Sequence, residues 1–405
     1  MNESFATSMQ WPGWPVIPAE GIEAVSRVLS SGKINYWTGN ECKSFEHAYA
    51  AYVGVPYALA VANGTLALEL ALSAFGVGEG DEVIVPSRTF IATASAVVRV
   101  GAIPVIADID PSTNNLTALS VAQVLTPRTK AIICVHLGGY PVDMDSVISL
   151  AEQVGAVVIE DCGQAHGATY KGRAIGSLGD AGCFSFCQDK ILPLGEGGLI
   201  TFKDEAAYKC AWAQRDHGRS YDKAHDTSVG SNSAEFEYLT DRFGTNARLG
   251  EMEGALGRVM LDYLDEYHEQ RTVNANHLAR AFEDIRGIRA LVPSACETAS
   301  GTNHAFYRLY ARIDVKNLKS DWSRNRVIAE INRRGAPCQY GSSALIGKEQ
   351  AFQRFADVNR ESLVGAHVAD AESIVFYVHP TLNEQHMAHV ADVVSAVLFE
   401  AMSGE

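Results

Sequence analysis

Short apolar runs alternate with helix-like segments between residues 57 and 161, and this alternation limits the possible folds of the chain more than any other feature. Runs such as EVIVP, AIPVIADID and AVVIEDC are rich in β-branched residues and have the length of buried strands. The segments that separate them repeat apolar residues at helical spacing. Strands and helices in this order predict an α/β fold with a mostly parallel central sheet, covered by helices on both faces.

Polar and aromatic residues follow the ends of these predicted strands. In an open α/β sheet, ligands bind in the crevice outside the carboxyl ends of the strands. Residues at those positions are therefore the candidates for a functional site. They are Thr65, Phe90, His136, Asp161, Gln164, His166, Ser185 and Lys190.

The second half of the chain has a different pattern. A polar segment at 215–238 predicts irregular structure, and residues 249–285 predict long helical coverage. Further on, the strand-like runs FYRLYARID and SIVFYV precede a predicted terminal helix at 384–402. We therefore expect a large domain over residues 1–285, which includes the N-terminal segment, and a smaller α+β domain over residues 286–405.

The composition narrows the classes of partner and compartment. The 405 residues contain 33 Lys and Arg against 48 Asp and Glu, and this net charge of −15 argues against charge-driven binding to nucleic acid or anionic membranes. Eight scattered cysteines without a complementing Cys/His pair predict no metal site. The sequence shows neither an apolar leader nor a long apolar span, so we expect a cytoplasmic protein with reduced thiols.

The stretch CFSFCQDKILPLGEGGLITF, residues 183–202, holds a lysine between two apolar strands. Lys190 follows the first strand, and a Gly-Glu-Gly-Gly bend leads into the second. An amine inside a protein is costly unless it is paired, neutralised or used covalently, and a Schiff base with an aldehyde cofactor removes its charge. The alternative is a solvent-exposed hairpin lysine, and this stretch alone does not decide between the two.

Three other positions offer groups that a phosphorylated aldehyde cofactor requires. Residues 63–65, Asn-Gly-Thr, open a predicted helix whose free N–H groups and dipole favour a phosphate, or they form an ordinary helix cap. Asp161 ends a strand, where it can hold a ring nitrogen protonated or cap neighbouring N–H groups. Phe90 can stack on a ring or belong to the core. Together with Lys190, these are the groups that pyridoxal 5′-phosphate (PLP) requires.

The sequence resembles the DegT/DnrJ/EryC1/StrS family of PLP-dependent sugar aminotransferases. The resemblance runs from about Ile22 to the C-terminal helix, and the pair EDCGQAHGA and FSF-x3-K-x4-GEGG is highly specific. It implies the type I fold of PLP-dependent transferases, like that of aspartate aminotransferase, with a smaller α+β C-terminal domain. Other matching motifs are NGTLALELAL, GDEVIVPSRTFIATASAV, ADIDPSTNNL, TPRTKAIICVHLGGYPVDMD, RDHGRSY and FGTNARLGEMEGALG.

The resemblance implies roles around the cofactor ring. Lys190 should be the Schiff-base lysine, and Asp161 should be the partner of the pyridinium nitrogen. Phe90 should stack on the ring, and Gln164 should approach its phenolic oxygen. These are expectations from matching motifs, position by position.

The resemblance also implies a phosphate site that two subunits share. Gly64, Thr65 and Ser185 should bind the phosphate within one chain. Asn246 matches the residue that family members lend to the phosphate of the neighbouring subunit's cofactor. We therefore expect a homodimer with shared active sites.

The expected reaction is transfer of an amino group from glutamate or glutamine to a keto sugar, nucleotide-linked, in the biosynthesis of surface polysaccharides such as lipopolysaccharide or of secondary metabolites. A keto-cyclitol aminotransferase would have the same catalytic core. The family also contains PLP-dependent sugar dehydratases, in which histidine replaces the lysine, and Lys190 disfavours that reading. A non-catalytic sensor of PLP or a sugar is a further alternative, without a basic patch to support it.

The substrate pocket is the part that the motifs define least. Gly138 stands where an aromatic residue is common, and residues 336–352 lack the frequent HYPPLH stretch. Histidines and arginines near the predicted site are candidates for substrate contacts. The arginines could bind a substrate phosphate. The histidines could contact the substrate, or they could be solvated loop residues. The candidates are Arg88, His166, His217, Arg219 and His304.

Overall fold

The computed structural model describes residues 9–225, 240–355 and 362–402. Its largest unit is a seven-stranded sheet with the order β1-β9-β8-β5-β4-β2-β3. Strand β9 runs antiparallel to both of its neighbours and the other pairs are parallel, which confirms the predicted mostly parallel sheet. The strands are β1 (Tyr57–Val61), β2 (Glu82–Pro86), β3 (Ile103–Ala107), β4 (Thr129–Val135), β5 (Val157–Asp161), β8 (Ala181–Ser185) and β9 (Gly198–Phe202).

Helices cover both faces of this sheet, so alternate residues of one strand belong to different cores. In β4, Ile132 packs in the core with α2, α5 and α6, whereas Ile133 packs in the core with α3, α4 and α7. Both faces of the sheet are buried, which explains why the strand sequences are continuous apolar runs. The helices are α2 (Glu41–Val53), α3 (Gly64–Ala74), α4 (Ala92–Arg99), α5 (Ala118–Val124), α6 (Met144–Val154) and α7 (Glu205–Arg215).

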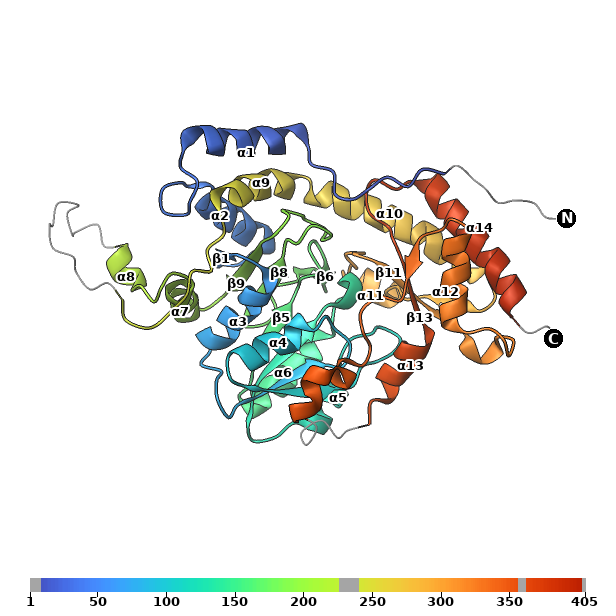
Figure 1. Ribbon diagram of the computed structural model, residues 1–405. Coiled ribbons are helices and arrows are strands. Elements are labelled where there is room, and N and C mark those ends of the chain that lie inside the picture. The colour runs from blue at the N-terminus through green and yellow to red at the C-terminus, as the bar shows by residue number, and fades with distance from the viewer. Residues whose placement is uncertain (1–8, 226–239, 356–361, 403–405) are drawn as a thin grey trace.

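A further layer of helices lies over α2. In Figure 1, α1 (Ala19–Ser31) lies across α9 (Glu251–Asp262), and α10 (Leu264–Glu283) continues toward the C-terminal part of the molecule. The sequence predicted long helical coverage here, and the structure has two consecutive helices. The N–H of Tyr263 bonds the carbonyl oxygen of Met260 (3.2 Å), three residues back, and so tightens and ends the last turn of α9.

A second, antiparallel sheet lies in the C-terminal part, with the order β10-β11-β13-β12. Helices α10, α12 and α14 contribute apolar residues to the core on this sheet, and Figure 1 shows α12 and α14 beside it. The expected α+β arrangement is therefore present. The elements are β10 (Ile288–Ala290), β11 (Leu309–Ile313), β12 (Cys338–Gln339), β13 (Ser373–Phe376), α12 (Arg324–Arg333) and α14 (Glu384–Ala401).

Segments from each end of the chain cross between the two sheets. Trp11 packs with the core of the second sheet, whereas Ile346 and Phe352 pack with a core of the first sheet. A division of the chain at 285/286 therefore stays a prediction. The segment between β12 and α13, which departs from the family motif, folds into two short 3-10 helices, Ile346–Lys348 and Gln350–Phe355.

The remaining elements are short. Part of the predicted irregular segment 215–238 lies outside the described residues, and its described part contains one helical turn, α8. Within the described ranges, every helix is too short or too polar to cross a membrane. The other elements are β6 (Thr169–Tyr170), β7 (Arg173–Ala174), α8 (Tyr221–Ala224), α11 (Ala295–Ala299), α13 (Val364–Glu372) and the 3-10 turns Leu137–Gly139 and Val315–Asn317.

Candidate active site

The turn after β1 and the end of β8 meet at the carboxyl edge of the large sheet. A Cβ atom on Gly64 would lie 2.7 Å from the Cβ of Ser185, so only glycine allows this approach. Asn63 caps α3 by accepting the N–H of Leu66 (2.9 Å). Among the described residues, the hydroxyls of Thr65 and Ser185 have no hydrogen-bond partner, and the N–H groups of Gly64 and Thr65 at the start of α3 are free. The arrangement is a small anion cradle.

Asp161 ends β5 next to this cradle. Its carboxylate accepts the hydroxyl of Thr93 (2.9 Å) on α4 and the N–H of Gly163 (3.2 Å). Burial raises the pKa of Asp161, although these two hydrogen bonds and the positive charge of Lys190 oppose the shift. Two fixed donors orient the carboxylate, which suits it to hold a protonated ring nitrogen.

Lys190 lies in the same cluster and is not an isolated surface residue. Its amine is 4.9 Å from the centroid of the Tyr307 ring, on the segment before β11. The backbone carbonyl oxygen of Lys190 accepts the indole N–H of Trp14 (2.9 Å), and the backbone N–H of Lys190 donates to the carbonyl oxygen of Cys187 (2.9 Å). Its charge affects the pKa of both Asp161 and His166, so the amine is close enough to interact electrostatically with both.

Gln164 is held with its amide nitrogen free. Its side-chain oxygen accepts the N–H of Gly138 (2.7 Å), and among the described residues the amide nitrogen has no acceptor. Gly138 has φ 66°, and a Cβ there would lie 2.8 Å from the Tyr310 ring. The departure from the family pattern at Gly138 therefore has a steric cause.

The structure corrects the substrate role considered for His166. The imidazole is fully buried, and Nε2 must donate to the carbonyl oxygen of Ser185 (2.9 Å), since a carbonyl only accepts. Nδ1 then accepts the hydroxyl of Tyr49 (2.7 Å). Burial lowers the pKa of His166 to about 4, so the ring is neutral. His166 positions the end of β8 and does not face the substrate.

His304 and Arg88 are also buried, contrary to the accessible positions expected. His304 stacks on Phe306 at 4.1 Å and accepts its N–H, and burial lowers the His304 pKa to about 3. Arg88 is 0 % exposed, and it donates to Asn114 (2.9 Å) and to Ser373 of the small sheet. Its place after a strand end predicted access, but the small sheet packs over it.

His217, Arg219 and Asn246 lie outside the cluster around Lys190, whereas Phe90 adjoins it through Thr93, whose N–H bonds the Phe90 carbonyl oxygen (3.2 Å). Phe90, four residues beyond the end of β2, is 68 % exposed, so the described residues leave most of its ring open. His217 is exposed, Arg219 lies over the Trp37 ring at 5.0 Å, and Asn246 is exposed beside the end of β1. Among the described residues, no contact joins the last three to Lys190.

Sequence reasoning missed four residues around the lysine: Trp14, Asp189, Tyr307 and Arg308. Tyr307 donates its hydroxyl to the carboxylate of Asp189. Arg308 lies over the rings of Tyr307 (4.3 Å) and Tyr377 (4.6 Å). Asp189 adjoins Lys190 in the sequence, so it is the one of the four that the sequence could have indicated. The others are brought in by tertiary packing.

A buried group beneath the site has the residue types of a metal centre. His136, Glu160 and Cys162 bring one potential ligand atom each within 4.8 Å of one another. His136 accepts the N–H of Val142 at Nδ1 (3.0 Å) and faces Glu160 at Nε2 (3.2 Å). Burial acts to raise the Glu160 pKa, but His136 and backbone donors outweigh it and the pKa is lowered. These hydrogen bonds occupy the group, which fixes the strand ends. The backbone donors to Glu160 are Gly176, Leu178 and Gly179.

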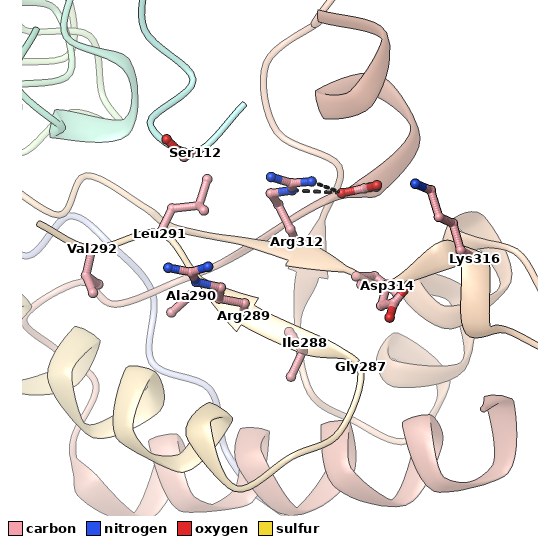
Figure 2. Close-up of a pocket in the computed structure, with 12 residues that line it drawn as sticks. Ser112, Gly287, Ile288, Arg289, Ala290, Leu291, Val292, Arg312, Asp314 and Lys316 are labelled. Carbon is pink, nitrogen blue, oxygen red and sulfur yellow. Dashed lines mark hydrogen bonds and ion pairs between the residues drawn. The ribbon is translucent and has the colours of Figure 1, made fainter. Parts of the chain in front are cut away.

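A hollow of about 480 Å³ lies elsewhere, along β10 and β11 of the small sheet. Figure 2 shows Arg289 and Lys316 beside it, and Arg312 paired with a carboxylate, that of Glu372. None of the predicted site residues lines this hollow. The chemistry therefore points to the open carboxyl edge of the large sheet.

Comparison with known proteins bears directly on this cluster. The family model of the DegT/DnrJ/EryC1/StrS aminotransferase family matches residues 15–395. The chain belongs to this family. An aminotransferase structure from Psychrobacter cryohalolentis is 42 % identical, with a TM-score of 0.92 over 96 % of this chain and 99 % of that one.

Two curated relatives have named activities or pathways. The L-glutamine:2-deoxy-scyllo-inosose aminotransferase of Streptomyces fradiae is 38 % identical over 74 % of this chain and 70 % of that protein. The spore coat polysaccharide biosynthesis protein SpsC of Bacillus subtilis is 37 % identical over 78 % of each chain. The chain is therefore a DegT-family transaminase with the type I aminotransferase fold, and its relatives include a cyclitol aminotransferase and a polysaccharide biosynthesis protein.

The enzyme is PLP-dependent, and the residues at the carboxyl edge fit that cofactor. The free hydroxyls of Thr65 and Ser185, together with the close approach that Gly64 allows, suit the binding of a phosphate. The carboxylate of Asp161 suits an interaction with the ring nitrogen. When bound, PLP acts as the electron sink for the bond-breaking step.

Proposed function

We propose that the enzyme transfers an amino group from glutamate or glutamine to a keto sugar, nucleotide-linked, in surface-polysaccharide or secondary-metabolite biosynthesis. The observation that carries this proposal is the cluster of Lys190, Asp161 and the Gly64–Ser185 cradle at one sheet edge. A lysine amine can act as nucleophile and as base in turn, which amino transfer requires. The relatives with sugar-type acceptors support the substrate class.

In this proposal, each residue of the cluster has a defined role. With PLP bound, the amine of Lys190 would hold the cofactor through a covalent bond to its aldehyde carbon and, once freed by the donor's amine, would take the proton from the donor's α-carbon at Nζ. The carboxylate of Asp161, oriented by Thr93 and Gly163, holds positive charge at the ring nitrogen. The free amide of Gln164 donates to the phenolic oxygen. Gly64, Thr65 and Ser185 anchor the phosphate, and Phe90 covers the ring.

The second candidate function is amino transfer to a keto-cyclitol. The Streptomyces fradiae relative acts with L-glutamine on 2-deoxy-scyllo-inosose, a cyclic ketone without a nucleotide. Both functions use the same cluster, so they differ only in the acceptor. A nucleotide-sugar enzyme should gain thermal stability from the nucleoside diphosphate alone, whereas a cyclitol enzyme should not respond to it.

Reduction with borohydride tests the central residue. We expect the cofactor label to be attached to Lys190 alone in peptide mapping, and Lys190→Ala to lose both the label and at least about a thousandfold of transamination, since nucleophile and base are removed together. Label on another lysine would refute the proposal. Amine exchange with labelled glutamine separates a transaminase from a sensor, which would show none.

We also propose that the enzyme is a cytoplasmic homodimer with shared sites. Asn246 is exposed, and the N–H of Ala62, just before the phosphate turn, bonds the carbonyl oxygen of its neighbour Ala247 (2.8 Å). Exposure at this edge suits a residue that serves a second chain. The cysteines, which are free thiols in the structure, suit a reducing compartment.

A further inference from the structure

We propose that Arg308 binds the α-carboxylate of the amino-acid donor and that Asp189 is the internal carboxylate that the donor displaces. This inference rests on the proposed amino transfer, because it assigns the donor's binding group. It makes Arg308 a specificity-determining residue, which the family motifs did not identify.

The guanidinium of Arg308 is fixed in orientation but keeps unused donors. It lies between two tyrosine rings, with its central carbon 4.3 Å from the Tyr307 centroid and 4.6 Å from that of Tyr377. Nη1 donates to the carbonyl oxygen of Tyr307 (2.9 Å). Among the described residues, Nε and Nη2 have no hydrogen-bond acceptor, and the side chain is 13 % exposed. One planar edge is therefore free to pair with a carboxylate.

The nearest carboxylate is held loosely enough to be exchanged. Asp189 Oδ2 lies 3.8 Å from Nη2 of Arg308, which is beyond hydrogen-bond length, and the Asp189 side chain is 54 % exposed. Asp189 has a second anchor in the hydroxyl of Tyr307. It can therefore leave Arg308 without losing every partner.

The arginine is also correctly placed relative to the reactive amine. Lys190 Nζ lies 4.9 Å from the centroid of the same Tyr307 ring that Arg308 covers. An α-amino acid carries its amine and its carboxylate on one carbon. A donor whose nitrogen is at the lysine's position therefore brings its carboxylate toward Arg308.

The local charge favours an anion. Arg271 is fully buried below the site, with Nη1 on the carbonyl oxygens of Phe306 and Tyr307 (3.3 Å each). Burial, followed by the charge of Arg308, lowers the pKa of Arg271 to about 9, so it is still positive at neutral pH. Asp189 lies 3.8 Å from Arg308 and its charge also acts on Arg271, and Lys190 is its neighbour in the chain, so positive charge predominates around this carboxylate.

An exchangeable carboxylate also answers a requirement of two-substrate transfer. The same pocket must accept an amino acid that carries an α-carboxylate and then a keto ring that has no carboxylate on its reacting carbon. When the donor leaves, Asp189 can return to Arg308 and keep the guanidinium from being unpaired.

Two substitutions of opposite sign test this inference in the holoenzyme. With L-glutamine as donor, Arg308→Met should raise KM by about 10- to 100-fold, the size of one charge-assisted pair. Asp189→Asn should lower KM for L-glutamine several-fold, because the competing charge is gone while the Tyr307 hydroxyl keeps an acceptor. With L-glutamine α-amide, which has no carboxylate, neither substitution should change KM appreciably. Equal effects on both donors, or a raised KM in D189N, would overturn the assignment.

The matched control is Arg312→Met on β11, the strand that Arg308 immediately precedes. Arg312 is paired with Glu372 (2.7 Å) beside the remote hollow in Figure 2, so KM for L-glutamine should stay at the wild-type value.

A binding measurement separates this inference from the proposed function. Calorimetric titration with 2-oxoglutarate needs no turnover, and its affinity should fall in Arg308→Met by about the factor seen in KM and rise in Asp189→Asn. If neither glutamine nor glutamate supports amino transfer, the proposed donors fail. The role of Arg308 is overturned separately, by 2-oxoglutarate that does not bind or that binds R308M as tightly as wild type.

Discussion

At the scale of single residues, His166 illustrates how the site depends on a neutral imidazole. Its two ring nitrogens are fully used, one as donor to Ser185 and one as acceptor from Tyr49. A second proton on Nδ1 would break the hydrogen bond from Tyr49 and place a charge in a buried position beside Lys190.

This arrangement predicts an acid-dependent loss of stability. The folded pKa of His166, about 4, lies below the usual 6.5, so the unfolded chain binds more protons and stability falls as the pH drops from about 6.5 toward 4. Each such histidine contributes a slope of up to about 1.4 kcal/mol per pH unit. His304 and His379, each with a pKa lowered to about 3 chiefly by burial, act in the same direction.

Urea unfolding midpoints between pH 7 and pH 5 measure this slope. His166→Gln should be less stable at pH 7, because Tyr49 and Ser185 lose a well-fitted partner, and its profile should be shallower than that of wild type. Parallel profiles for the two proteins would show that His166 does not titrate on unfolding.

At the scale of elements, the start of α3 carries the closest approach in the site. Gly64→Ala would place a Cβ 2.7 Å from Ser185 and push β8 away from the helix, at a cost of about 1–3 kcal/mol. Since both elements supply the phosphate cradle, we expect the affinity for PLP to fall more than tenfold.

Absorbance titration with PLP checks this expectation. Gly78→Ala in the next connection is the matched control, because its Cβ would meet only the carbonyl oxygen of Val100 at 3.9 Å. Unchanged PLP affinity in G64A would mean that the cradle does not hold the phosphate.

At the scale of the whole molecule, the proposed shared site makes a strong prediction about mixed dimers. Lys190→Ala and Asn246→Asp should each be inactive or nearly so as homodimers, the second because a carboxylate repels the phosphate. Mixed in equal amounts and allowed to exchange subunits, they should recover about a quarter of the wild-type activity, since half the dimers would have one intact site.

Activity assays of the mixture, with sedimentation to follow the exchange, measure this recovery. Dimers that exchange subunits without regaining activity would place Lys190 and Asn246 in the same chain's site. A monomer in sedimentation would rule out the shared site directly.

The local sequence determined most of the fold and where the candidate reactive residues lie along it. Apolar runs and helical spacing depend on neighbours in the chain, so the parallel strands, their covering helices and the strand-end positions of Asp161, Ser185 and Lys190 could be predicted from it. Matching motifs added the roles expected around PLP.

The tertiary structure alone decided which of the other candidates can meet a substrate. Packing of the small sheet buries Arg88, and the end of β8 and Tyr49 on α2 bond the two nitrogens of His166. The segment before β11 brings Tyr307 and Arg308 to the lysine. These contacts join residues far apart in the chain. Their cause is the burial of apolar surface between whole elements, which no local pattern records.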